Sequence, residues 1–115
     1  RSFLSVLILA VFVWLIPVPA RAAEEKSRIE SLINHIENLK DAKFIRNGSE
    51  YDSKNAAKFL RGKWGAKEKE IKTAEDFIDK AASASGTTGE PYLIKFNDGR
   101  QVKCGDYLKE QLKKS

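Results

Sequence analysis

The sequence has little of what disulfides and metal sites need. Among its 115 residues there is one cysteine, Cys104, one histidine, His35, and no methionine. A single cysteine excludes a disulfide within the chain, so a hydrophobic core has to hold the fold together. One histidine and one cysteine fit no common zinc site, and the acidic residues follow no calcium-loop spacing. We therefore expect no metal and no cofactor.

Long apolar segments are equally scarce, with one exception near the start. Residues 3–16 are apolar except for Ser5, and two prolines and Ala20-Arg21-Ala22 follow. This run is shorter than the ~20 residues of a transmembrane helix. It is typical of a signal peptide, with small residues at the cleavage site. We expect a signal peptide over residues 1–22, cleavage after Ala22, and one domain over residues 23–115 in the periplasm.

The prolines of this segment bear on its local structure. We expect Pro17 and Pro19 to end any helix there, because proline lacks a backbone N–H and clashes with the preceding turn. The alternative is an uncleaved segment that tethers the domain to the inner membrane. The mass of the exported protein distinguishes the two forms.

Excess charge of one sign is also small. The full chain has 21 basic and 16 acidic residues, and the loss of Arg1 and Arg21 with the signal peptide leaves 19 basic residues. Because nucleic-acid binders concentrate basic residues in a patch or stripe, this interspersed pattern argues against a nucleic-acid partner.

Four stretches have the apolar periodicity of amphipathic helices. Residues that favour N-caps precede the last three, namely Asp52 or Ser53, Thr73 and Asp106. The predicted helices span about residues 24–41, 53–65, 73–82 and 106–112.

Two short hairpins complete the expected fold. Asn47-Gly48 suits a type I′ turn that pairs Arg46 with Ser49 and Phe44 with Tyr51. A serine- and glycine-containing loop over residues 83–91 leads to strands at residues 92–96 and 101–104, with Cys104 buried on the second strand. The sequence thus predicts an α+β fold: about four helices on one side of two short antiparallel hairpins that form a small sheet.

Four segments carry a resemblance to a known family: residues 44–48, 60–64, 73–78 and 82–92. Together they resemble the YfeK-like family of small exported bacterial proteins, a domain of unknown function. The resemblance implies export and a shared fold but no activity or catalytic residue. Gly65, the charged run after it and Cys104 depart from the family pattern.

Candidate binding residues are basic or lie in turns. Lys54, Lys58 and Arg61 form one stripe of a predicted helix, which suits either an anionic partner or plain solvation. Arg46 and Asn47 lie at a tight turn, a rigid position for recognition, although Arg46 could instead pair with Glu50. Ser83 and Ser85 lie in the loop that could hold an anion with backbone amides, or serve only as a flexible connection.

Catalytic residues are harder to find. His35 lies at the edge of the first helix's apolar stripe, where it is either boundary packing or a general base. We therefore expect a non-enzymatic envelope module that binds an envelope protein or an anionic envelope component, with no assigned oligomeric state. The alternative is a small envelope hydrolase that uses His35 with a carboxylate.

Overall fold

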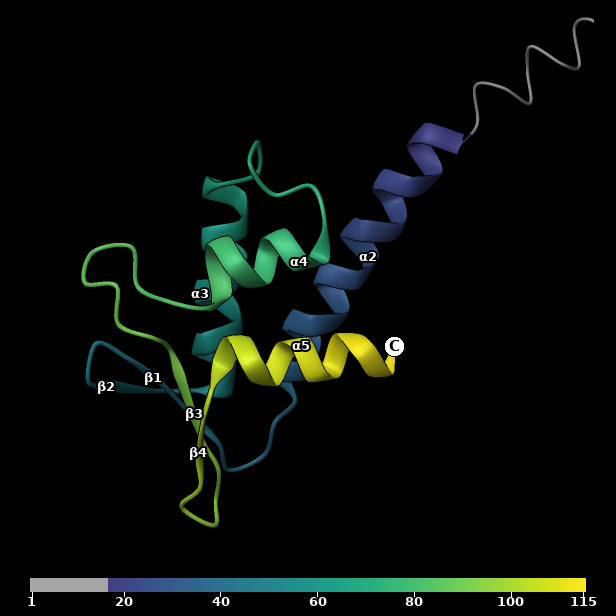
Figure 1. The fold of residues 1–115 in the computed structure, drawn as a ribbon. Helices are drawn as coiled ribbons and strands as arrows, with labels where there is room; N and C mark the ends of the chain where they lie inside the picture. The colour runs from purple at the N-terminus through teal and green to yellow at the C-terminus, as the bar shows by residue number, and fades with distance from the viewer. Residues whose placement is uncertain (1–16) are drawn as a thin grey trace, which may run out of the picture.

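The computed structural model describes residues 17–115, so the apolar run at residues 3–16 lies outside the described part of the chain. The elements follow one another in the order α2 (Pro17–Glu37), β1 (Lys43–Arg46), β2 (Ser49–Asp52), α3 (Ser53–Ala66), α4 (Ala74–Phe77), the π-helical segment η1 (Ile78–Ala82), β3 (Leu93–Lys95), β4 (Gln101–Lys103) and α5 (Cys104–Lys114). Four helices, with α4 and η1 counted as one, and an antiparallel sheet confirm the α+β class (Figure 1).

The two hairpins form one sheet with the strand order β2-β1-β3-β4. Phe44 pairs with Tyr51 and Arg46 with Ser49, as the two-residue turn predicts. The backbone φ angles of Asn47 and Gly48 are +49° and +81°, and a type I′ turn requires both to be positive. The hairpins join through β1 and β3, where Phe44 lies opposite Ile94.

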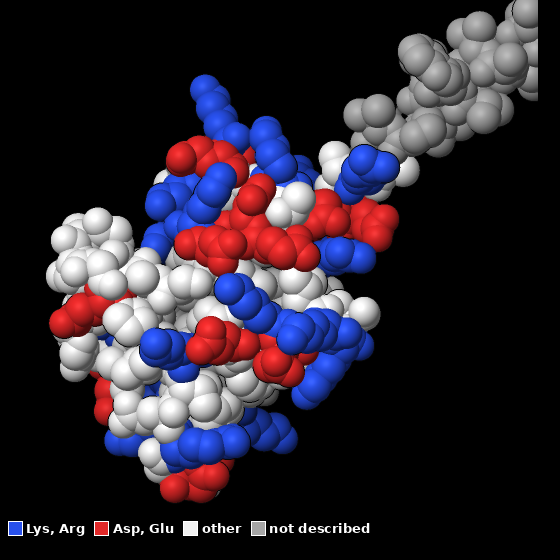
Figure 2. All heavy atoms as spheres, viewed as in Figure 1, with Lys and Arg blue, Asp and Glu red and all other residues white. Residues whose placement is uncertain are grey.

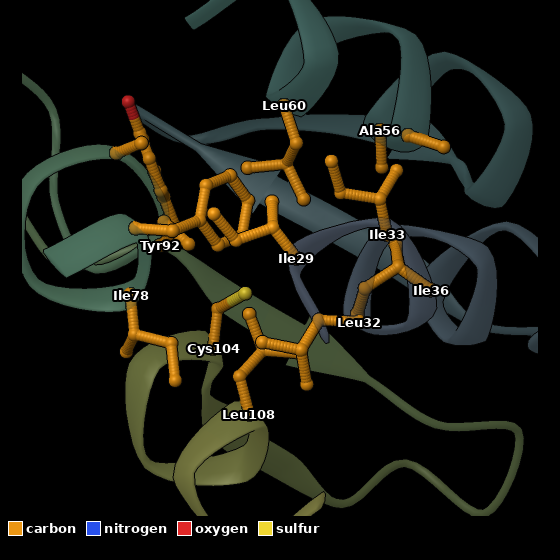
Figure 3. Packing of buried hydrophobic residues seen from close by; sticks show 14 of the residues in the cluster. Ile29, Leu32, Ile33, Ile36, Ala56, Leu60, Ile78, Tyr92, Cys104 and Leu108 are labelled. Carbon is orange, nitrogen blue, oxygen red and sulfur yellow. The ribbon is translucent and has the colours of Figure 1, made fainter. Parts of the chain in front are cut away.

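A single core lies between the helices and one face of the sheet. Figure 3 shows side chains from α2, α3 and α5 converging on Tyr92 and Cys104. Phe44 and Ile94 bring the sheet into this core, whereas Lys43, Gln101 and Lys103 on the opposite face are exposed. The alternation of buried and exposed residues along the strands therefore places the helices on one side.

The first helix differs from its prediction. α2 runs from Pro17 through the expected cleavage site at Ala22 and ends at Glu37, so Pro17 and Pro19 do not end it. Both prolines lie within the helical backbone of α2. The N-terminal half of α2 extends beyond the other elements (Figure 1).

Two caps occur where the sequence predicts them. Asp52 accepts a hydrogen bond from the Asn55 amide (2.8 Å), and Thr73 accepts one from the Asp76 amide (3.0 Å). The Asp76 carboxylate in turn accepts from the Lys72 amide, and this hydrogen bond is the main cause that lowers the pKa of Asp76. These caps fix the starts of α3 and α4.

The last helix begins earlier than predicted. Asp106 is not its cap: α5 starts at Cys104, after Lys103. The Cys104 amide donates to the Tyr92 carbonyl (2.8 Å), so this residue both ends the strand pairing and opens the helix. Cys104 is buried, as predicted.

The third helix also departs from regular geometry, because α4 passes into π-helical turns over Ile78–Ala82. A π-turn shifts the backbone pattern to five residues. The Ser83 hydroxyl donates to the Ile78 carbonyl (2.7 Å), which satisfies an acceptor at this point. Among the residues of the described part, no helix is both long and apolar enough to cross a bilayer.

Substitutions at two glycines of the helices should change the stability of the fold in opposite directions. A Cβ at Gly105 would collide with the Ser83 side chain, whereas one at Gly62, in the exposed middle of α3, would meet nothing within 4 Å. We expect Gly105→Ala to lower the free energy of unfolding by about 1 to 3 kcal/mol through overpacking. Gly62→Ala should raise it by roughly 0.5 to 1 kcal/mol because glycine is a poor helix former. Urea denaturation of both variants measures the effects, and a stabilised Gly105→Ala protein would contradict this packing.

Candidate binding site

A hollow of about 380 Å³ lies between the first hairpin and α3. Its lining is aromatic and aliphatic except for two cations and one amide; the residues are Phe44, Arg46, Tyr51, Asn55, Ala56, Lys58 and Phe59. The hairpin contributes one wall through the Phe44–Tyr51 pair, and α3 contributes the other. Such a concave, mostly apolar surface with a few polar groups is typical of ligand sites.

Arg46 is the polar centre of this hollow. Its guanidinium carbon lies 4.5 Å from the centroid of the Phe59 ring, a cation–π contact. Its Nε is buried and has no hydrogen-bond partner in the described structure. A buried donor without a partner is costly, so the position of this Nε is unfavourable in the free protein.

The charges around the hollow favour an anion. Lys58 is exposed at its edge, and no acidic side chain lines it. The nearest acidic residues of β2 are engaged elsewhere, since Asp52 caps α3 and Glu50 lies 3.7 Å from the Lys95 Nζ. The Arg46–Glu50 ion pair considered from the sequence is thus replaced by the Lys95–Glu50 pair. Arg46 and Lys58 therefore carry the local charge.

Behind the hollow, an aromatic cluster holds Phe59 in place. The Phe59 ring lies 5.7 Å from the Tyr92 ring in an edge-on arrangement, and Phe44 lies 5.2 Å from Tyr92. Lys63 donates to the Tyr92 hydroxyl (2.8 Å) and to the Ala84 carbonyl (3.2 Å). The cluster joins α3, the sheet and the loop after η1. These contacts fix the Phe59 ring next to the Arg46 guanidinium.

The basic stripe of α3 separates into three different environments. Lys58 lines the hollow and Lys54 is exposed one turn away. Arg61 donates to Glu37 (3.1 Å) and to the Asn34 side chain (2.8 Å), so it ties α3 to α2. The stripe is therefore no continuous anion-binding face.

The turn and the loop meet beside the hollow. The Asn47 side chain donates to the Ser85 hydroxyl (3.2 Å) and accepts from the Thr88 hydroxyl (2.6 Å). Ser85 is buried and also accepts from the backbone amide of Thr87. Asn47 and Ser85 thus brace the hairpin against the loop, while Ser83 bonds to η1 elsewhere.

His35 has a neighbour that the sequence did not reveal. Its Nε2 lies 2.6 Å from the Tyr107 hydroxyl, across the α2–α5 contact. The shallow hollow beside it contains no Asp or Glu side chain, and none bonds to His35 in the described residues. Cys104 is also unsuited to chemistry, because burial raises the pKa of its thiol to about 12. Within residues 17–115, His35 is thus bonded to a tyrosine and not to a carboxylate.

Sequence reasoning missed most of the hollow's lining. Phe44 and Tyr51 were expected to pair, but Ala56 and Phe59 belonged only to the apolar stripe of a predicted helix, and Asn55 was not singled out. The Asn47-Gly48 turn and the cap at Asp52 could have revealed these residues, because together they put the hairpin and α3 face to face. Within the described chain, no group of three or more His, Cys, Asp or Glu residues could hold a metal.

Comparison with known proteins gives a family. The model of a family of unknown function, DUF5329, matches residues 23–115. The chain belongs to this family. It is also 42% identical over 89 residues to the uncharacterized protein YfeK of Salmonella typhimurium, a match covering 75% of this chain and 74% of that protein. The resemblance to the YfeK-like family is thereby confirmed, and no solved structure matches.

The partial burial of His35 predicts how stability depends on pH. Burial lowers the pKa of His35 from its usual 6.5, and the charge of Lys114 lowers it further. Since the unfolded chain then binds the proton more tightly than the folded one, the stability is fully present above pH 6.5 and is lost as the pH falls through that value toward the folded pKa.

We expect the free energy of unfolding to decrease between about pH 7.5 and about pH 5.5, and His35→Gln to reduce this decrease. Urea denaturation at the two pH values measures it. An equal pH dependence in both proteins would contradict the partly buried, neutral imidazole.

Proposed function

We propose that the chain is an exported protein of the periplasm that acts without catalysis, by binding an envelope protein or another anionic envelope component in the hollow between the first hairpin and α3. The observation that carries this proposal is the Arg46 guanidinium, which is held on the Phe59 ring with its Nε buried and unpartnered. An anion in the hollow would meet the positive charges of Arg46 and Lys58 in its lining. Export is supported by the signal-like start and by the family match, which begins at residue 23.

The distribution of charge favours binding at a small site rather than on a broad electrostatic surface. Figure 2 shows acidic and basic side chains interspersed over the face that carries α4 and α5. The Lys109–Asp79 ion pair (3.5 Å) joins α5 to η1. Because a nucleic-acid binder needs a concentrated basic surface, this pattern favours recognition at a local site such as the hollow.

Two lysines one turn apart on α3 provide a matched test. We expect Lys58→Glu to weaken binding of the anionic ligand at least about tenfold, because it places a carboxylate where the ligand's charge would lie. Lys54→Glu makes the same change of charge outside the lining, so at about 0.15 M salt it should weaken binding clearly less than Lys58→Glu does. The protein, purified in its exported form, is screened against immobilised acidic peptides and carboxylated glycans, and the affinities of bound probes are measured.

Arg61 is left unchanged in this test, because its loss would also break the contact between α3 and α2. Far-ultraviolet circular dichroism and thermal unfolding verify that both lysine variants fold. The proposal fails if no anionic probe binds, or if Lys54→Glu weakens binding as much as Lys58→Glu.

A further inference from the structure

The outer edge of β2 lies beside the hollow and is unpaired. β2 is an edge strand of the sheet. One side of it pairs with β1, and no strand of the described chain pairs with the opposite side. Tyr51 of this strand lines the hollow, and α3 begins directly after it at Ser53. An unpaired edge next to a helix is a surface to which an extended polypeptide can add.

The direction of the backbone groups at this edge follows from the strand register. The Phe96 amide donates to the Arg100 carbonyl (2.8 Å) across the β3–β4 hairpin. In an antiparallel sheet, the backbone groups of successive residues point alternately to one neighbouring strand and to the other. Counting from the bonded Phe96 back along β3, and then across to β1, shows that Phe44 and Tyr51 form a hydrogen-bonded pair. The N–H and C=O of Glu50 therefore point outward from the sheet.

The side chains of an added strand would meet the hollow. Residues beside Tyr51 on such a strand point to the same face as Tyr51, because side chains alternate with a period of two. On that face lie Phe59, Arg46 and Lys58, and no acid. An acidic side chain there would meet both cations, while the Glu50 side chain lies on the other face with Lys95.

We infer that the hollow takes an extended polypeptide segment that adds to β2 as a further strand and directs an acidic side chain at Arg46 and Lys58. This inference rests on the proposed function and specifies its ligand. The backbone of Glu50 supplies main-chain hydrogen bonds, and the aromatic side chains contact the apolar residues of the segment. A carboxylated glycan could use the cations but would gain little from the strand edge.

A pair of substitutions at one position tests the strand edge. Proline at position 50 removes the outward N–H but no bond to β1, and proline is tolerated at sheet edges. Glu50→Ala removes the same side chain, including its contact with Lys95, and keeps the N–H. The probe is an acetylated peptide of about eight residues in which every second position carries valine and glutamate in turn, with threonine between them. One face of the extended strand then presents both an apolar and an acidic side chain to the hollow.

We expect the peptide to bind the exported protein and its Glu50→Ala variant with similar affinity, and Glu50→Pro to weaken binding about tenfold. Thermal unfolding and circular dichroism verify that both variants fold. Methylation of alternate peptide nitrogens should also weaken binding, because it removes backbone donors.

Equal binding by Glu50→Pro and Glu50→Ala would overturn the inference. The inference would also be overturned if the protein did not bind the peptide but did bind a uronic-acid oligosaccharide in a way that depends on Lys58. That result would still support the proposed function. Absence of binding by both the peptide and the oligosaccharide would count against both.

Discussion

The pairing of β1 with β3 is the contact on which the rest of the structure depends. Each hairpin has strands of only three or four residues, and an isolated hairpin of this size is marginal in water. Pairing joins segments fifty residues apart, with Phe44 opposite Ile94. It also brings Tyr92, the residue before β3, against Phe44 and Phe59. Without this pairing the aromatic cluster would lose its centre.

The hollow is a consequence of how α3 leaves the sheet. The helix starts immediately after β2, capped by Asp52, and buries Ala56, Ala57 and Leu60. Small residues let the start of the helix lie close to the hairpin, while the larger Phe59 side chain extends over it and carries the Arg46 guanidinium. The same cap that fixes the helix thus places aromatic and cationic side chains around a concave surface next to an unpaired strand edge.

Local patterns predicted the local structure well, and tertiary contacts explain the differences. The Asn47-Gly48 turn fixed the register of its hairpin, and Thr73 capped its helix, because both effects act within a few residues. The start of α5 at Cys104 depends on a bond to the distant Tyr92 carbonyl, which no local pattern reveals. Likewise, the sequence pattern indicated that Arg61 belongs to a solvated stripe, whereas its partners Glu37 and Asn34 come from another helix.

An NMR titration of the exported protein with the valine–glutamate peptide tests most directly whether the hollow beside β2 binds an acidic extended segment. We expect this binding to concentrate the amide shifts at Arg46, Glu50, Tyr51 and Lys58, with little change in α5. Shifts centred instead on the hollow beside His35, or spread evenly over the exposed lysines, would contradict it.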